Sequence, residues 1–345
     1  MHHNNQHSVL VALSGGVDSA VAVILLKEAK YHIEAFHMEI SRSGVEKARE
    51  LAAVLSVNLH VLNVNAVFQK EVVDYLMQNY TAGLTPNPCV RCNALVKFRL
   101  GHQLRERLGL RYFATGHYAR LLDGVCHKRL LKGLDVKKDQ SYFLHQVPIE
   151  LLDHTMFPLG DLTKKHVREL AVLHGIGDAV ARESQELCFI SGDYREFLLS
   201  KGAISAFQPG DVVTADGVVI GRHSGIAGYT IGQRQGLGIS DATPYYVLAV
   251  EAATNRLIVG KKEDLMSGFC MVRGINWLVS LEEAVSMPCE VRLRYRHKGV
   301  TARLEPAASG EMMVLFNEPV PAITPGQFAV FYRDEQVLGG GEICG

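Results

Sequence analysis

Two segments of the sequence contain residue types that can do chemistry. The first is a pair of cysteines, Cys89 and Cys92, in NPCVRC at residues 87–92. The second is SGGVDS at residues 14–19, which follows a short apolar run. A CxxC pair is typical of metal sites, redox switches and sulfur-handling sites, and glycines between a strand and a helix are typical of anion sites. The sequence therefore predicts a thiol site and a phosphate site.

The glycine segment has the properties of a phosphate-binding loop. Gly15 and Gly16 let backbone N–H groups approach an anion, and the dipole of the following helix favours negative charge there. The Walker lysine and the GxGxxG spacing are both absent, so a different phosphate chemistry is implied. SGGVDS resembles the pyrophosphate-binding loop of enzymes that split ATP into AMP and pyrophosphate, where Asp18 would work through Mg²⁺. The structural alternative is a tight turn capped by Ser14 or Asp18.

The cysteine pair has two structural alternatives, a zinc site and inert packing. A structural zinc site needs about four ligands, and no second CxxC or HxxxH follows at a suitable spacing. A third cysteine, Cys188, lies downstream in ESQELCFISG. Together with an ATP loop, two thiol sites indicate sulfur chemistry, in which adenylation of an amide-like oxygen lets sulfur replace it. Reactive thiols need a lowered pKa, and Arg91 and Lys97 are the expected causes.

Composition excludes several classes of protein. With 48% hydrophobic residues in 345, the chain can bury the cores of two or three globular domains. The longest apolar stretch, residues 20–26, is too short to span a bilayer, and the polar residues 1–8 do not resemble a secretory signal. Seven scattered cysteines do not suggest a disulfide framework, so we expect a cytoplasmic protein. The net charge of zero neither indicates nor excludes a polyanionic partner.

The apolar patterns predict an α/β domain followed by β structure. Strand-like and helical segments alternate up to about residue 116, which is typical of a parallel sheet with helices on both faces. The expected strands are 9–13, 32–38, 59–64 and 111–116, and the expected helices begin at 17, 45, 65 and 93. Residues 140–202 have a mostly helical pattern. Beyond Phe207, glycine and β-branched residues predict short strands, including a hairpin at Asp216-Gly217.

One predicted strand carries positive charge. In CEVRLRYR at residues 289–296, Arg292, Arg294 and Arg296 alternate with apolar residues, so a strand there would show three guanidinium groups on one face. With Lys298 and Arg303 they would form a basic stripe suited to an RNA backbone. The alternative is an ordinary solvated strand face.

Many motifs in the chain, in the same order, resemble those of the tRNA-specific 2-thiouridylases, which thiolate the wobble uridine of certain tRNAs. They are SGGVDSA, TPNPCVRCN, LVKF, ATGHY, LLKGLDVKKDQSYFL, FPLGDL, ELCFI, YTIGQRQGLGI, RLRYR and TPGQFAVFY. The resemblance implies a parallel sheet of the adenine nucleotide alpha hydrolase (PP-loop) type and two small, mostly β domains, the last a β-barrel. The expected domains are 1–203 (ATP-binding, with a helical extension), 204–265 (central β) and 266–345 (tRNA-binding barrel).

The resemblance also implies the site residues. ATP would lie at Ala12, Leu13, Ser14, Gly15, Gly16, Val17, Asp18, Ser19, Met38 and Gly116. Cys188 would carry sulfur as a persulfide that attacks the adenylated base, and Cys92 would release it. The resulting disulfide between Cys92 and Cys188 would be reduced in each cycle by thiol exchange. The tRNA contacts would be Asn87, Pro88, Cys89, His117, Lys138, Asp139, Gln140, Arg294, Tyr295 and Gln327.

The implied partners are the anticodon arm of tRNA and a sulfur-donor protein, such as a cysteine desulfurase or a sulfur carrier, with no membrane. ATP and Mg²⁺ are the implied cofactors. The chain departs from the family pattern in two places. Many members have Asp where this chain has Cys89, so Cys89, Cys92 and Cys188 offer three thiolates to an iron–sulfur (4Fe–4S) cluster with one open iron. The segment SRSGVEK after Met38 is shorter than in relatives.

Two other functions also fit parts of the sequence. An AMP-forming amidating synthetase that acts on a small carboxylate would use the same ATP loop, but it would need neither the thiols nor a basic β domain. A non-catalytic RNA-binding protein would explain the basic strand and leave SGGVDS without a role. The histidines at 102, 145, 166 and 174 are expected to be core or surface residues rather than ligands.

Overall fold

The computed structural model describes residues 7–176, 188–190, 192–307 and 310–344. The chain forms two compact units. The first unit comprises Met1–Glu71, Cys89–Phe189 and Asp334–Val337. The second comprises Val72–Pro88, Ile190–Arg333 and Leu338–Gly345. Within the described residues, no helix is both long enough and apolar enough to cross a membrane.

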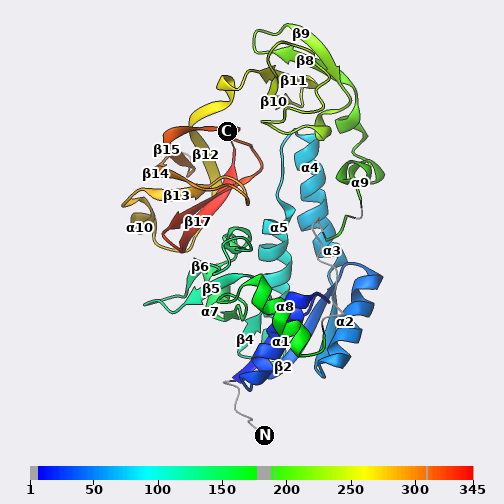
Figure 1. Ribbon diagram of the computed structural model, residues 1–345, viewed down its shortest axis with the longest axis vertical. Coiled ribbons are helices and arrows are strands. Elements are labelled where there is room, and N and C mark those ends of the chain that lie inside the picture. The colour runs from blue at the N-terminus through cyan, green and yellow to red at the C-terminus, as the bar shows by residue number, and fades with distance from the viewer. Residues whose placement is uncertain (1–6, 177–187, 191, 308–309, 345) are drawn as a thin grey trace. The chain divides into compact units, whose positions relative to one another are not determined.

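A parallel sheet of five strands forms the centre of the first unit (Figure 1), as the alternating pattern predicts. The strand order is β3-β2-β1-β4-β7. The strands are β1 (Ser8–Ala12), β2 (His32–Glu39), β3 (Asn58–Asn63), β4 (Tyr112–Ala114) and β7 (Thr155–Met156). In the register of the central strand, Val11 pairs with Ala35 on one side and with Ala114 on the other.

Both faces of this sheet are packed. Val9, Val11 and Leu13 share a buried core with three helices: α1 (Val17–Glu28), α2 (Arg42–Val54) and α8 (Lys164–Leu173). Another part of the core is aromatic, with the ring of Phe113 centred 5.7 Å from Phe36 and 5.4 Å from Phe98. A sheet buried on both sides needs near-continuous apolar strands, which explains why the β1 sequence hardly alternates.

The sheet has a topological switch point at β1. The chain passes from β1 to its neighbour β2, whereas its other neighbour β4 comes much later in the sequence. In open α/β sheets, ligands bind outside the carboxyl ends of the strands where the strand order reverses. The segment SGGVDS follows β1, and Thr115, Gly116 and His117 follow β4, so both lie at this point.

The helical segments on either side of the CxxC pair are irregular. The chain forms α3 (Asn65–Phe68), a π-helix η2 (Gln69–Asp74), α4 (Tyr75–Thr81), α5 (Pro88–Arg91), a second π-helix η3 (Cys92–Phe98) and α6 (Arg99–Arg107). The helix that was expected from residue 93 is present, and its first part, Cys92–Phe98, is a π-helix. Short π segments inside helices are frequent at functional sites, and η3 begins at Cys92.

The rest of the first unit is a hairpin and short helices. Strands β5 (Ala119–Leu122) and β6 (Arg129–Lys132) pair antiparallel, and Gln336 pairs with Leu131. The 3₁₀-helix η4 (Ser141–Leu144) and α7 (Ile149–Asp153) follow.

The second unit contains a four-stranded sheet of order β10-β11-β8-β9. Its strands are β8 (Gly210–Thr214), β9 (Val219–His223), β10 (Tyr246–Glu251) and β11 (Arg256–Gly260). Strands β8 and β9 pair antiparallel, which confirms the hairpin expected at Asp216-Gly217. The helices nearby in the sequence are α9 (Tyr194–Ser200), η6 (Ile204–Phe207), η7 (Ile226–Gly228) and η8 (Glu263–Leu265).

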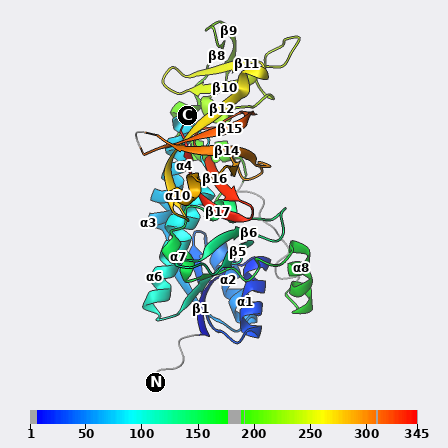
Figure 2. The same cartoon turned by 90° about the vertical axis from the view of Figure 1, so that its left-hand side faces the viewer.

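An antiparallel barrel completes the second unit (Figure 1 and Figure 2). The strand order is β12-β15-β14-β13-β16-β17, and pairing of β12 with β17 closes it. The strands are β12 (Met266–Trp277), β13 (Cys289–Arg292), β14 (Val300–Pro306), β15 (Met312–Pro321), β16 (Phe328–Arg333) and β17 (Gln336–Ile343), with α10 (Leu281–Val285) between the first two. Val272, Val291, Val314 and Phe331 belong to its buried core.

The prediction of a basic strand over residues 289–296 is wrong. Strand β13 ends at Arg292, and Val291 pairs with Val300 across the connection to β14. Arg294 and Arg296 lie exposed in this connection, where the carbonyl of Arg294 accepts a hydrogen bond from the N–H of His297 at 2.9 Å. The three guanidinium groups therefore do not share a strand face.

Candidate functional site

The segment SGGVDS forms an open turn at the switch point. The Ser19 hydroxyl donates to the carbonyl of Gly16 at 2.8 Å and accepts from the N–H of Ser14 at 3.2 Å. Gly15 has φ +84°, a conformation that glycine adopts without strain. The N-cap residue of α1 is Gly16, which has no side chain to cap the helix, and its N–H donates to the Ser14 hydroxyl at 3.4 Å. The first N–H groups of α1 and its dipole favour an anion here.

The carboxylate of Asp18 is held by two residues that the motif analysis did not select. The ammonium of Lys164 lies 2.8 Å from each of its oxygens, and the Tyr118 hydroxyl donates to Oδ1 at 2.7 Å. The side chain of Lys164 is only 7% exposed. A carboxylate beside a phosphate loop is the type of oxygen ligand that Mg²⁺ prefers, so the donor chemistry fits this cation.

Gly116 and Met38 lie near the same loop. A Cβ atom on Gly116 would lie 2.9 Å from the carbonyl carbon of Asp18 and 3.0 Å from the nitrogen of Ser19. This close approach explains why glycine occupies the position after β4. Met38 is half-buried near the carboxyl end of β2, the neighbour of β1. The structure thus brings the predicted nucleotide residues to one edge of the sheet.

The three predicted thiols lie close enough in the first unit to affect one another's pKa values. They are Cys89, Cys92 and Cys188. Burial raises the pKa of Cys92 to about 12 and that of Cys89 to about 11. Burial also raises the pKa of Cys188, although this residue lies at the surface. The positive charge of Lys97 lowers all three pKa values, but by less than burial raises them. The expectation of lowered thiol pKa values is therefore wrong for this form of the protein.

Lys97 and Arg91 differ in their relation to the thiols. The ammonium of Lys97 donates to Oδ1 of Asn93 at 3.0 Å, and Asn93 Nδ2 donates to the carbonyl of Phe143 at 3.2 Å. Arg91 instead pairs with Glu71, at 2.9 Å between Nη2 and Oε2. Lys97 is among the charges that lower the pKa values of the thiols, and the role of Arg91 stays a prediction.

The arrangement does not form a metal site. Among the described residues, no group of three or more His, Cys, Asp or Glu side chains is placed to hold a metal ion. A cluster would need Cys89, Cys92 and Cys188 as simultaneous ligands.

The histidines at 102, 145, 166 and 174 lie in the core or at the surface, as expected. His102 and His145 are buried, and burial lowers the pKa of His102 to about 3 and that of His145 to about 4. His166 and His174 are exposed. His117 is buried and bonds through Nδ1 to the Thr115 hydroxyl at 2.7 Å, and burial holds its pKa well below 6.5. It is therefore a neutral histidine in this form of the protein.

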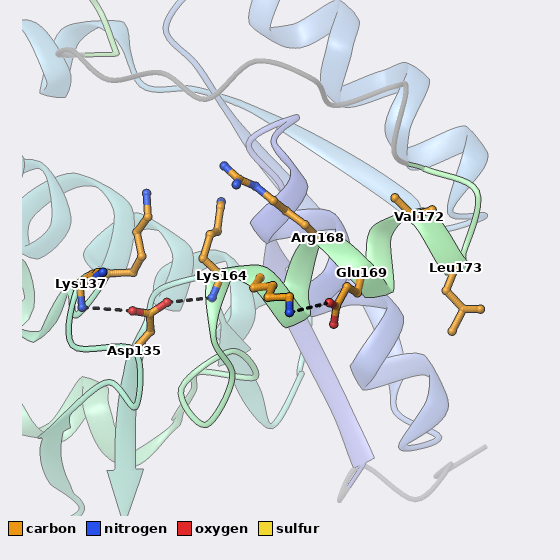
Figure 3. A pocket seen from close by; sticks show the side chains of 9 residues that line it. Asp135, Lys137, Lys164, Arg168, Glu169, Val172 and Leu173 are labelled. Carbon is orange, nitrogen blue, oxygen red and sulfur yellow. Dashed lines mark hydrogen bonds and ion pairs between the residues drawn. The ribbon is translucent and has the colours of Figure 1, made fainter.

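A basic pocket of about 710 Å³ lies beside α8 (Figure 3). Its lining has five cationic side chains, two carboxylates and two apolar side chains, Val172 and Leu173. The lining residues with charge are Asp135, Lys137, Lys138, Lys164, Lys165, Arg168 and Glu169. Since Lys164 also binds Asp18, this pocket adjoins the glycine loop.

Comparisons with known proteins place these features in one family. A family model described as the tRNA methyl transferase HUP domain matches residues 7–192. The tRNA methyl transferase PRC-barrel domain matches residues 196–261, and the aminomethyltransferase beta-barrel domain matches residues 267–343. Together these three matches extend over nearly the whole chain.

Curated relatives cover the chain from end to end. The tRNA-specific 2-thiouridylase MnmA of Acidithiobacillus ferrooxidans (strain ATCC 53993 / BNL-5-31) is 40% identical over 344 residues, covering 97% of this chain and 98% of its own. The same-named protein of Microcystis aeruginosa is 41% identical over 349 residues, covering 98% of each chain. That of Moorella thermoacetica is 41% identical over 352 residues, covering 97% of this chain and 98% of its own. The chain belongs to the tRNA-specific 2-thiouridylase family.

In this member of the 2-thiouridylase family, hydrogen bonds to backbone N–H groups fix the segment of Lys138, Asp139 and Gln140. Oδ1 of the buried Asp139 accepts from the backbone N–H groups of Gly133 and Ser141, at 3.0 Å each. Oε1 of Gln140 accepts from the N–H of Tyr118 at 2.9 Å. Lys138 lines the basic pocket. The acid and the amide shape the loop, and the lysine is the member of the three that faces the pocket.

Two of the other predicted tRNA contacts, Cys89 and His117, belong to the first unit. The rest belong to the second unit: Asn87, Pro88, Arg294, Tyr295 and Gln327. The amide of Gln327 donates to the carbonyl of Thr85 at 2.8 Å, close in sequence to Asn87 and Pro88. Arg294 is exposed and Tyr295 is half-buried in the connection between β13 and β14. Arg292 instead pairs with Glu290 at 2.9 Å and lies 4.7 Å from the ring centre of Tyr332.

The sequence analysis missed two residues of the site, Lys164 and Tyr118. Tyr118 ends the motif ATGHY, and Lys164 is the first lysine of TKKHVREL, within the mostly helical pattern of residues 140–202. The signal that identifies Lys164 is its position at the start of an amphipathic helix, where a positive charge opposes the helix dipole and needs another reason. That reason is the carboxylate of Asp18.

Proposed function

We propose that this protein uses ATP to replace the 2-oxygen of the wobble uridine of tRNA with sulfur, releasing AMP and pyrophosphate. The end-to-end similarity to proteins named tRNA-specific 2-thiouridylase supports this assignment. One observation in the structure carries the proposal: a glycine loop at a helix start and three cysteines that affect one another's pKa values belong to the same compact unit.

In the proposed first step, the uracil O2 attacks the α-phosphorus of ATP and pyrophosphate leaves. The open turn of Ala12–Ser19, with Met38 and Gly116, would bind the nucleotide. Mg²⁺, when bound, would offset the charge of the phosphates. Asp18 is the carboxylate in position to hold that cation, and Gly116 keeps the loop backbone close to the strand end.

In the proposed second step, the outer sulfur of a Cys188 persulfide attacks C2 of the adenylated base and AMP leaves. The thiol of Cys92 then attacks the inner sulfur of Cys188, which releases 2-thiouridine and leaves a disulfide between Cys92 and Cys188. The sulfur is reduced as the two thiols are oxidised, so an external thiol must reduce the disulfide before the next cycle. The raised thiol pKa values support a resting state that is protonated and protected from oxidation.

The persulfide requires a sulfur donor, and a cysteine desulfurase or sulfur-carrier protein is the proposed partner. The other proposed partner is the anticodon arm, with the predicted tRNA residues as contacts. A tRNA substrate supports a cytoplasmic location. We also propose domain boundaries at 1–203, 204–265 and 266–345, which the ranges of the family matches support.

An iron–sulfur form of the same reaction is the second candidate, because Cys89 supplies a third thiol near Cys92 and Cys188. Anaerobic purification with iron analysis and visible absorbance, on the wild type and Cys89→Ser, separates the two routes. Full activity without iron would exclude the cluster.

One assay tests the assignment as a whole. The protein is incubated with tRNA, ATP, Mg²⁺ and a persulfide-bearing donor, and the digested nucleosides are read by mass spectrometry. We expect 2-thiouridine that depends on ATP. ATP turnover that ignores tRNA would favour an amidating synthetase, and failure to bind ATP would favour a non-catalytic RNA-binding protein.

A further inference from the structure

Lys164 is a buried cation at the edge of the phosphate loop. Its side chain is 7% exposed, and its ammonium lies 2.8 Å from both carboxylate oxygens of Asp18 and 5.8 Å from the ring centre of Tyr118. Removing an ammonium from water is costly unless a counter-charge accompanies it. The carboxylate of Asp18 provides that counter-charge here.

The carboxylate that pairs with this ammonium, that of Asp18, has another proposed role. Under the proposed function, Asp18 binds Mg²⁺ that arrives with ATP. An ammonium on both oxygens and a divalent cation on the same carboxylate would repel each other. The arriving polyphosphate carries several negative charges, so it offers the ammonium a new counter-charge within the same site.

The space next to Lys164 can receive such an anion. The pocket of about 710 Å³ beside α8 has more cationic than acidic side chains in its lining. The side chains of Lys164 and Arg168 extend to the same side of α8 (Figure 3). Asp135 is already engaged, because its two oxygens accept from the backbone N–H groups of Lys137 and Lys164 at 3.1 and 2.9 Å.

The next residue of the same helix provides a natural comparison. Lys165 also lines the pocket, but its side chain is 87% exposed and lies 3.8 Å from Glu169. Its neighbour Lys164 is instead buried on the carboxylate of Asp18. The two lysines thus have the same charge and the same helix, but different positions relative to the glycine loop.

We propose that Lys164 exchanges partners in each cycle: it holds Asp18 before nucleotide binds, and it binds the β- and γ-phosphates when ATP is present. The exchange leaves the carboxylate of Asp18 available for Mg²⁺. After the α–β bond breaks, the same ammonium holds the pyrophosphate in the basic pocket until it leaves. This inference rests on the proposed use of ATP and adds a phosphate-binding residue to it.

The test compares nucleotides that differ only in these phosphates. Dissociation constants of the full chain for α,β-methylene-ATP with Mg²⁺ and for AMP are measured by calorimetry without tRNA or sulfur donor. We expect Lys164→Met to weaken α,β-methylene-ATP by roughly ten- to a hundred-fold, the range for a lost charge-assisted bond, with AMP unchanged. Lys262→Met, which removes an exposed lysine of the second unit that does not line the pocket, should change neither constant. Lys164→Arg should retain most of the affinity for α,β-methylene-ATP.

An equal loss for both nucleotides would show a general distortion of the loop and would overturn the proposal, as would no loss for either. If Lys164→Met does not fold, as judged by its melting curve, Lys164→Gln takes its place with the same expected pattern. A wild-type protein that binds neither nucleotide would overturn the proposed function itself. A wild type that binds both, with the wrong pattern in the variants, would overturn only the role of Lys164.

Discussion

Gly116 packs directly against the backbone of Asp18. A Cβ atom at Gly116 would lie 2.9 Å from the carbonyl carbon of Asp18 and 3.0 Å from its oxygen, closer than a real Cβ atom tolerates. The start of the first helix and the end of β4 are therefore in contact through a residue without a side chain. The position of the phosphate loop depends on this contact.

The first prediction follows from that contact. Gly116→Ala should push the Asp18 backbone away and misplace the loop, and misplacement of about 1 Å can reduce rates by roughly a hundred-fold. We expect ATP affinity, measured by calorimetry, to fall at least about ten-fold while the protein still folds. Gly268→Ala is the control, because a Cβ atom there meets nothing within 4 Å. Unchanged ATP affinity in Gly116→Ala would mean that the loop does not hold the nucleotide.

The second prediction concerns the protonation of the thiols. A thiol is neutral below its pKa and nucleophilic above it, so raised pKa values shift its reactivity to higher pH. Alkylation of Cys92, with a pKa of about 12, should still be rising above pH 9, where the rate of an ordinary cysteine with pKa about 8.5 levels off. The rate is measured by iodoacetamide labelling and peptide mass spectrometry, with the exposed Cys126 as the reference for reagent access.

A variant of Lys97 separates the effect of burial on the thiol pKa values from the effect of the nearby charge. Because the ammonium of Lys97 lowers the pKa values of Cys92 and Cys188, Lys97→Met should raise both further and slow their alkylation at a fixed pH. Arg91→Met should have no such effect, since Arg91 pairs with Glu71. A plateau for Cys92 near pH 8, or faster labelling in Lys97→Met, would contradict this account.

The loop and the sheet could be predicted because their signals are local. SGGVDS combines a strand end, two glycines and a helix start in six residues, and the alternating pattern around it indicates a parallel sheet. The partner of Asp18 could not be found in this way. Lys164 lies 146 residues from Asp18, and only the packing of α8 beside α1 brings them together.

Two predictions failed because tertiary structure outweighed a local pattern. Lys97 does lower the thiol pKa values, but the burial that raises them depends on the folded chain around Cys92. Arg292, Arg294 and Arg296 alternate as a strand would, but the register that pairs Val291 with Val300 forces the chain to turn between them. Gly299, with φ +88°, is part of that turn.

The third prediction tests whether the thiols and the ATP loop act in separate steps, sulfur transfer and adenylation. Cys188→Ala should lose all thiolation, because no other residue is proposed to carry the persulfide. ATP-dependent adenylation of tRNA should survive, since the loop of Ser14–Ser19 is intact in this variant. Thiolation is read by nucleoside mass spectrometry, and adenylation by pyrophosphate release in the presence of tRNA. Retained 2-thiouridine in Cys188→Ala would refute the assignment of the sulfur-carrying residue.

The last prediction concerns the basic connection between β13 and β14. Arg294 and Arg296 are exposed there, whereas Arg292 pairs with Glu290 and lies over Tyr332. If the two exposed residues contact RNA phosphates, each contact should add about 0.7 to 0.9 to the dependence of log affinity on log salt. The double variant Arg294→Ala/Arg296→Ala should thus reduce that slope by roughly one to two and weaken tRNA binding in low salt.

Arg292, at the end of β13, provides a matched control for the variant of Arg294 and Arg296. Arg292→Ala removes the same charge from the same part of the chain, but it removes a residue that Glu290 already neutralises. We expect it to lower the melting temperature through lost packing on Tyr332 and to leave the salt slope unchanged. Binding is measured by fluorescence anisotropy of labelled tRNA across a series of salt concentrations. An equal change of slope in both variants would mean that net charge, rather than contacts by the exposed arginines, attracts the RNA.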